Sequence, residues 1–463
     1  MTLSDLNFIF RFLPVFMIVF AVAGTKLRGV VLLIASMFFY YSGAGVVGLA
    51  FLAGSVLLNY VAARLIAGSK GILKKLLLAG TLLIDFGILL FFKYAGLFAA
   101  AVSAESRVQE FINSLVMPLG ISFYTFTLAA YVIDVYRGTV QAEKNVIRYA
   151  DHAVMFPKLL SGPIVRYDEL KSELYDPRIR RENIEDGFCT FTIGLGMKVL
   201  IADALLPVWE QVMSIGYENI STPLAWIGAL GFALRLYFDF QGYSLMAMGT
   251  GKMIGFRIPL NFDMPYISGS ISEFWRRWHI TLGAWFKDYV YIPLGGSKKG
   301  KLRLVISLTV VWILTGIWHG STLNFILWGM TILVFILLEK FLLKSFLEKH
   351  RVLAHIYVCF IMVQVWVIFA IPDIREIGNY YARLYPFLRK ANEFVYRQDY
   401  VEVLKSKWPV LAAGIFFCLP YYRNWYEKYK KSPVTVVILL AVFWVSVYMI
   451  MRQGSNPFMY CNF

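Results

Sequence analysis

The sequence predicts an all-helical polytopic membrane protein, and three observations lead to this class. First, 59% of the 463 residues are hydrophobic and only 16% are charged, whereas soluble domains carry about 25% charged residues. Second, apolar runs of roughly 20 residues, the length that a membrane-spanning helix needs, recur along the whole chain. Third, the runs lack the regular alternation of apolar and polar residues that is typical of a membrane β-barrel.

Twelve apolar segments qualify as candidate membrane helices. Several are short, and helix ends read from sequence are uncertain by a few residues, so we expect about eleven transmembrane helices plus re-entrant or interfacial helices. We expect residues 1–463 to form a single integral-membrane domain, with a polar segment at 373–407 between membrane helices. The candidate segments are 6–23, 29–42, 46–66, 74–99, 113–136, 187–213, 223–246, 303–319, 322–343, 352–371, 408–421 and 433–451.

The charge of the chain is strongly basic, at +16. In a soluble protein this charge would suggest nucleic acid, but no nucleic-acid-binding motif accompanies it. In a membrane protein, basic residues gather in cytoplasmic loops and attract anionic lipid headgroups. The stretch Glu273–Arg303 carries seven Lys or Arg residues against two acids. We therefore expect this stretch to face the cytoplasm, with membrane lipids as contacts and no nucleic acid as a partner.

Neither the cysteines nor the histidines follow a metal-binding pattern. The four cysteines are far apart with no CxxC pair, and the five histidines form no HExxH arrangement. The sequence also lacks the GxSxG and P-loop motifs of hydrolases and nucleotide-binding proteins. We expect no metal site and no disulfide framework.

Ionisable residues inside apolar segments are functional candidates, because burying a charge in lipid is costly. Arg235 and Asp239 are spaced i, i+4 and so have the option of pairing on one helix face. For Asp85 and Asp203 we favour a structural role. The complete set is Asp85, Asp134, Arg137, Asp203, Arg235, Asp239 and His319.

His319 is the most informative of these residues. It lies 16 residues into an apolar run that starts at Leu304, about 24 Å along a helix, and Thr315 precedes it by one turn on the same face. A neutral imidazole in a desolvated recess is suited to act as a general base toward a hydroxyl. The alternatives are a buried structural histidine that bonds a neighbouring helix and, with less support, a haem ligand.

The stretch from Ser272 to Gly296 combines aromatic and basic residues. Its tryptophans and tyrosines recur at helical spacing, which predicts an amphipathic helix at the membrane interface. Arg276 and Lys287 are eleven residues apart and would share another face of that helix. His279 is in a position to enter the same recess as His319. Guanidinium and ammonium groups bind phosphate, so we assign binding of an acyl donor to Trp275, Arg276, Arg277, Trp278 and Lys287.

These segments resemble the membrane-bound O-acyltransferase (MBOAT) family, in particular its bacterial alginate O-acetyltransferase type. The resemblance runs from about Met117 to the end of the chain, and residues 117–330 carry most of it. The matching stretches are Met117-PLGISFYTF, Tyr131-VIDVYRG, Phe156-PKLLSGPIVR, Phe238-DFQGYSLMAMG, Gly255-FRIPLNFDMPY, Ser272-EFWRRWHITL, Trp285-FKDYVYIPLGG, Thr315-GIWHGSTLNFILWG and Ser455-NPFMY.

The resemblance implies an all-helical fold around a central funnel, with His319 as the catalytic residue and His279 as a second functional position. It implies a multi-pass protein of the bacterial inner membrane that moves an acetyl group from cytoplasmic acetyl-CoA to an exported polysaccharide or cell-wall glycan. An extracytoplasmic SGNH-type acetyltransferase is the partner that it implies. The other class of function open to this sequence is a transporter or flippase for a lipid or glycan, which needs a tunnel but no general base.

Overall fold

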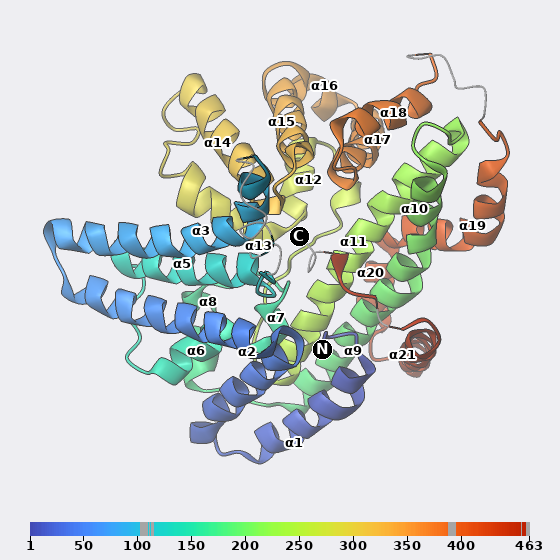
Figure 1. The fold of residues 1–463 in the computed structure, drawn as a ribbon. Coiled ribbons are helices and arrows are strands. Elements are labelled where there is room, and N and C mark those ends of the chain that lie inside the picture. The colour runs from blue at the N-terminus through green and yellow to red at the C-terminus, as the bar shows by residue number, and fades with distance from the viewer. Residues whose placement is uncertain (102–109, 111, 113–114, 388–394, 455, 460–463) are drawn as a thin grey trace. The chain divides into compact units, whose positions relative to one another are not determined.

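The computed structural model describes residues 1–101, 110, 112, 115–387, 395–454 and 456–459, and every regular element among them is a helix (Figure 1). Seven of these helices are long and apolar enough to cross a membrane, or eight if one bent pair forms a single span. The all-helical, polytopic class predicted from the sequence is therefore confirmed. The seven are Thr25–Gly68, Gly71–Ala99, Arg181–Ile215, Lys301–His319, Leu323–Lys349, Arg351–Ala370 and Pro433–Gln453.

This number is smaller than the eleven spans that we expected, and three of the predicted regions account for part of the difference. The segments 29–42 and 46–66 belong to one 44-residue helix, Thr25–Gly68, which is kinked where Gly45 adopts a positive φ of 67°. The first apolar segment forms the shorter helix Phe8–Val22. The segment 408–421 belongs to the bent pair, Asp399–Phe417 and Tyr421–Tyr429, whose axes differ by 71°.

The described chain forms two compact units, and the first comprises residues 1–192 and 243–260. Its elements are η1 (Phe8–Phe12), α1 (Leu13–Val22), α2 (Thr25–Gly68), α3 (Gly71–Ala101), α5 (Ile121–Arg137), α6 (Val146–Val154), α7 (Phe156–Leu159), α8 (Tyr167–Tyr175), most of α9 (Arg181–Gly196) and the end of α11 (Thr222–Met253). Helices α2, α3 and α5 pack side by side, and α6 packs on α2 (Figure 1). The buried Asp85 of α3 accepts a hydrogen bond from Asn59 of α2 at 2.8 Å, which is consistent with the structural role predicted for it.

The second unit comprises residues 193–242 and 261–459 among the described ones, and it contains the candidate site. Two of its helix pairs, α14 with α15 and α15 with α17, pack closely. Its elements are η2 (Met197–Ala202), α10 (Asp203–Ile215), most of α11, η3 (Pro265–Ile267), α12 (Ile271–Arg277), α13 (Ile280–Phe286), η4 (Lys287–Tyr291), α14 (Lys301–His319), α15 (Leu323–Leu338), η5 (Glu339–Leu343), α16 (Lys344–Lys349), α17 (Arg351–Ala370), α18 (Ile374–Leu384), α19 (Asp399–Phe417), α20 (Tyr421–Tyr429) and α21 (Pro433–Gln453).

The intramembrane acids of this unit are neutralised by a lysine that our sequence argument did not use. Lys198 Nζ lies 2.7 Å from Asp203 and 2.7 Å from Asp239. The other oxygen of Asp239 accepts the backbone N–H of Met459 at 2.8 Å. Lys198, rather than Arg235, therefore makes the contact with Asp239. The i, i+4 interpretation was wrong because tertiary packing brings η2 beside α11.

The polar segment predicted at 373–407 contains α18 and the start of α19, and its residues 388–394 lie outside the described chain. Side chains fix the described parts to α11 and to the loop before it. The hydroxyl of Tyr380 donates to the carbonyl of Ala225 at 2.7 Å, and Asp399 accepts the backbone N–H of Ser221 at 2.8 Å. The described parts of this segment therefore belong to the second unit.

Candidate active site

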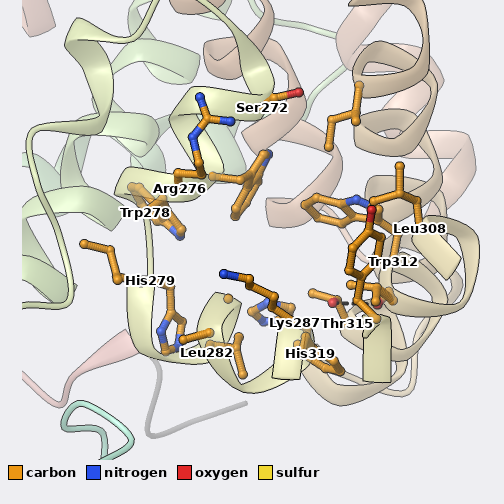
Figure 2. A pocket seen from close by; sticks show the side chains of 18 of the residues that line it. Ser272, Arg276, Trp278, His279, Leu282, Lys287, Leu308, Trp312, Thr315 and His319 are labelled. Carbon is orange, nitrogen blue, oxygen red and sulfur yellow. Dashed lines mark hydrogen bonds between the residues drawn. The ribbon is translucent and has the colours of Figure 1, made fainter. Parts of the chain in front are cut away.

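A cavity of about 570 Å³ lies within the second unit (Figure 2). Helix α14 forms one wall with a stripe of residues three or four apart, from Leu308 to His319, as expected for one helix face. The segment from Ser272 to Tyr291 forms the opposite wall, and Lys340 contributes from η5. Figure 2 shows Lys287 reaching toward the middle, with Ser272 and Arg276 toward one end and His279 and His319 toward the other.

His319 is the last residue of α14, and its side chain is buried. Its ring packs against aromatic neighbours, with centroid distances of 4.7 Å to Trp318, 4.9 Å to Trp328 and 5.2 Å to Phe369. The chain then turns into α15 at Gly320, where an added Cβ would lie 2.2 Å from the ring of Phe325. The end of α14 therefore holds His319 in an aromatic pocket that opens to the cavity.

Close packing of α14 against α15 keeps this wall in place. A Cβ added at Gly316 would lie 2.7 Å from the carbonyl oxygen of Phe325, and one added at Gly329 would lie 2.7 Å from that of Trp312. Real Cβ atoms do not come so close to backbone atoms, so glycine allows the two helix backbones to approach. The hairpin thus aligns the cavity-lining face of α14.

The aromatic-basic stretch is not one continuous helix, and this prediction was wrong. Helix α12 ends at Arg277 and α13 begins at Ile280. Between them Trp278 is extended, and His279 is left-handed with φ 46° and ψ 53°. The i, i+3 spacing of Trp275 and Trp278 therefore does not describe a single helical stripe. Tertiary contacts override the local pattern, since the ring of Trp278 packs at a tilted angle against that of Trp366, with centroids 4.7 Å apart.

His279 lines the same cavity as His319, as predicted. Its ring is buried and packs edge-on against Phe240, with centroids 4.8 Å apart. Its Nδ1 lies 3.2 Å from the side-chain oxygen of Asn261. Burial lowers the pKa of His279 to about 3, because the imidazolium loses its hydration. The ring is therefore neutral at physiological pH.

Four of the five residues assigned to donor binding line the cavity: Trp275, Arg276, Trp278 and Lys287. The fifth, Arg277, points elsewhere and forms ion pairs with Glu273 at 2.9 Å and Asp263 at 3.1 Å. Arg277 is therefore a structural residue of α12 in this geometry. Arg276 and Arg277 have different surroundings because successive side chains project from different sides of a helix.

Our sequence argument missed two polar features of the cavity. Lys340, which lines it, follows Glu339, whose carboxylate accepts the backbone N–H of Ser272 at 3.1 Å and that of Ile271. This contact ties η5 to the start of α12, and Lys340 adds a third cation to the cavity lining. The signal in the sequence was a Glu-Lys pair at the end of an apolar segment. The indole Nε1 of Trp275 is buried and has no hydrogen-bond partner among the described residues, so it can donate to a ligand.

The fold and the cavity define a polytopic membrane protein in which two imidazoles, three cations and an unused donor line one chamber. A family model described as MBOAT, membrane-bound O-acyltransferase family, matches residues 142–372, which include the whole lining. The chain is 34% identical to the probable alginate O-acetylase AlgI of Pseudomonas putida over the full length of both proteins.

Two further relatives widen the range of acceptors. The chain is 28% identical to the peptidoglycan O-acetyltransferase of Helicobacter pylori, covering 98% of this chain and 96% of that protein. It is 29% identical to the teichoic acid D-alanyltransferase of Bacillus subtilis, covering 47% of this chain and 58% of that one. The chain belongs to the membrane-bound O-acyltransferase family and is an enzyme of that family.

Proposed function

We propose that this protein is an O-acetyltransferase of the bacterial cell membrane that carries acetyl groups from cytoplasmic acetyl-CoA to hydroxyls of an exported polysaccharide or cell-wall glycan. One observation carries the proposal: His279 and His319 line the same cavity as Arg276, Lys287 and Lys340. A thioester donor with phosphate groups needs cations that bind the phosphates. It also needs a base near the acyl group that can deprotonate the attacking hydroxyl. This cavity contains cations and imidazoles.

In this mechanism Arg276, Lys287 and Lys340 bind the phosphates of the donor, and its acyl end extends along α14 toward His319. The imidazole of His319 takes the proton from the acceptor hydroxyl as the oxygen attacks the thioester carbonyl. The tetrahedral intermediate then expels the CoA sulfur, which receives that proton from His319. The N–H of Trp275 is a candidate hydrogen-bond donor for the developing oxyanion.

The relatives support a glycan acceptor, because alginate and peptidoglycan appear in their names. We propose an extracytoplasmic SGNH-type acetyltransferase as the partner, which receives the acetyl group on a hydroxyl at this site and passes it to the glycan. We also propose about eleven membrane passages around a central funnel, with the Glu273–Arg303 stretch on the cytoplasmic side. The topology is testable with Ser297→Cys, which should resist impermeant thiol reagents in intact cells and react in inverted vesicles.

The direct test uses purified protein in proteoliposomes with acetyl-labelled CoA and short oligosaccharides. Mannuronate oligomers, cello-oligosaccharides and muropeptides should be compared under the same conditions, with and without the SGNH-type partner. We expect label to move from CoA to at least one glycan class, and the His319→Ala protein to show no transfer. Thioester turnover that is unchanged in His319→Ala would contradict the proposed mechanism.

A further inference from the structure

The side chain of Asn261 connects His279 to the start of α13. Its Oδ1 lies 3.2 Å from His279 Nδ1, 3.3 Å from the backbone N of Thr281 and 2.9 Å from the hydroxyl of Thr281. The backbone carbonyl of Asn261 also accepts the N–H of Ile280 at 2.9 Å. Asn261 is completely buried, so this geometry is fixed by the core and not by solvent.

These contacts determine which nitrogen of His279 carries the proton. A backbone N–H only donates, so the Asn261 atom that faces Thr281 N is the carbonyl oxygen and not the amide nitrogen. That oxygen only accepts, so His279 Nδ1 must donate to it. We propose that Asn261 is a positioning residue that holds His279 in the Nδ1–H tautomer and thereby makes its Nε2 the hydrogen-bond acceptor.

The backbone supports the same conclusion. His279 is one of only two non-glycine residues with a positive φ among the described residues. Such a conformation is unfavourable and persists only where its surroundings impose it. Asn261 imposes it by accepting the first N–H groups of α13, so the same residue sets both the backbone and the ring. The lowered pKa of His279 keeps the ring neutral, and only a neutral ring has a tautomer to select.

The consequence for the reaction rests on the proposed function. An Nε2 lone pair can accept a proton or a hydrogen bond from the acceptor hydroxyl or from a water molecule that the hydroxyl contacts. The Nε2–H tautomer would instead place an N–H at Nε2, and this N–H would repel the O–H group of the acceptor. Asn261 therefore decides whether His279 helps His319 to orient the hydroxyl, although it does not itself line the cavity.

The experiment is NMR of protein labelled with ¹³C and ¹⁵N at histidine, in detergent or nanodiscs at neutral pH. Imidazole ring shifts distinguish the two tautomers, and His279→Gln assigns the signal by its loss. His152 provides an internal comparator, because its Nε2 lies 3.1 Å from the carbonyl oxygen of Val165 and must donate to it. We expect Nδ1–H for His279 and Nε2–H for His152, and an Nε2–H form of His279 in the wild type would overturn the proposal.

Two substitutions at Asn261 and one control sharpen the test. Asn261→Leu removes the acceptor and should move His279 to the Nε2–H form that imidazole favours in water. It should also lower kcat by up to about tenfold, the loss expected for removal of the His279 hydrogen bond itself, with the KM for the acetyl donor changed less than twofold. Asn261→Asp keeps an acceptor oxygen and should retain the tautomer and most of the kcat. Thr281→Val removes a different bond to the same oxygen and should leave the tautomer unchanged.

The outcomes separate this inference from the proposed function. The NMR measurement needs no substrate, so a wild-type protein without acetyl transfer would refute the proposed function while the tautomer could still be determined. Equal loss of kcat in Asn261→Leu and Asn261→Asp with the wild-type tautomer in both would refute the positioning role. If Asn261→Leu fails to fold, the wild-type spectrum and Asn261→Asp still decide the matter.

Discussion

His152 in the first unit and His279 in the second are buried to almost the same degree, and burial lowers the pKa of each to about 3. Their surroundings differ. The ring of His152 packs against Tyr167 at 5.2 Å, and its Nε2 donates to a backbone carbonyl. The ring of His279 lines a 570 Å³ cavity, and its Nδ1 donates to a side-chain amide.

Burial and a lowered pKa therefore do not identify a functional histidine in this protein. Both are consequences of desolvation, which the core imposes on any imidazole that it encloses. Two differences between His279 and His152 are informative. His279 lines a cavity that is also lined by cations, and the two rings carry their proton on different nitrogens. By the first of these differences His279 and His319 are candidate site residues, because both line the cavity, and His152 is a residue of the core.

Replacing each of two buried histidines, His319 and His152, by alanine should have opposite consequences. His319→Ala should lower acetyl transfer by about 10²–10⁴-fold per folded molecule, the contribution typical of a general base. His152→Ala should leave turnover per folded molecule near the wild-type value. It should instead lower the free energy of unfolding by about 1–3 kcal/mol, because the carbonyl of Val165 loses its donor.

The measurement is turnover normalised to monodisperse protein, together with thermal unfolding of each variant. Near-wild-type turnover in His319→Ala would remove our assignment of the catalytic residue. A loss of turnover in well-folded His152→Ala would show that the core histidine has a role that its packing does not reveal.

His279→Ala should have a smaller effect on turnover than His319→Ala. If His279 supplies one hydrogen bond to the acceptor, its removal costs about 1–1.5 kcal/mol, or about tenfold in rate. The loss should appear in kcat, with little change in the KM for the donor. Parallel kinetics of both alanine variants test this order, and an equal loss would mean that the two histidines act as one unit.

Arg276 and Arg277 allow a matched comparison within one helix turn. Arg276→Ala should raise the KM for the acetyl donor several-fold, about 1 kcal/mol or more of phosphate binding, with a smaller change in kcat. Arg277→Ala should leave the KM unchanged and lower stability, because it releases Glu273 and Asp263. The reverse pattern in steady-state kinetics would place the donor on the other side of α12.

Stability in acid is a property in which His152 and His279 should behave alike. Each has a native pKa of about 3, below the unfolded value of about 6.5, so the unfolded state binds more protons between these values. Stability should therefore fall as pH drops below about 6.5, by up to about 1.4 kcal/mol per pH unit for each histidine. His152→Gln and His279→Gln should each reduce this slope in denaturant unfolding, and an unchanged slope would contradict burial of that ring in its neutral form.

Much of the architecture follows from the sequence because hydropathy acts locally. Apolar runs of sufficient length must become helices in lipid, where each backbone polar group needs an internal partner. The kink at Gly45 falls in the gap between two predicted segments. Glycine tolerates the positive φ found there. Hydropathy does not report whether a helix continues through a kink, so the segments 29–42 and 46–66 were predicted separately although one helix, Thr25–Gly68, contains both.

From the sequence we could predict the helical membrane class, the position of His319 at the end of an apolar helix and the cluster of cations near His279. The tertiary structure alone decided the break between α12 and α13, the separation of Arg276 from Arg277, the pairing of Lys198 with Asp239 and the arrival of Lys340 in the cavity. Each of these four features depends on contacts with residues that are distant in the sequence. Asn261 stands 18 residues before His279, and no helical period or local motif connects them.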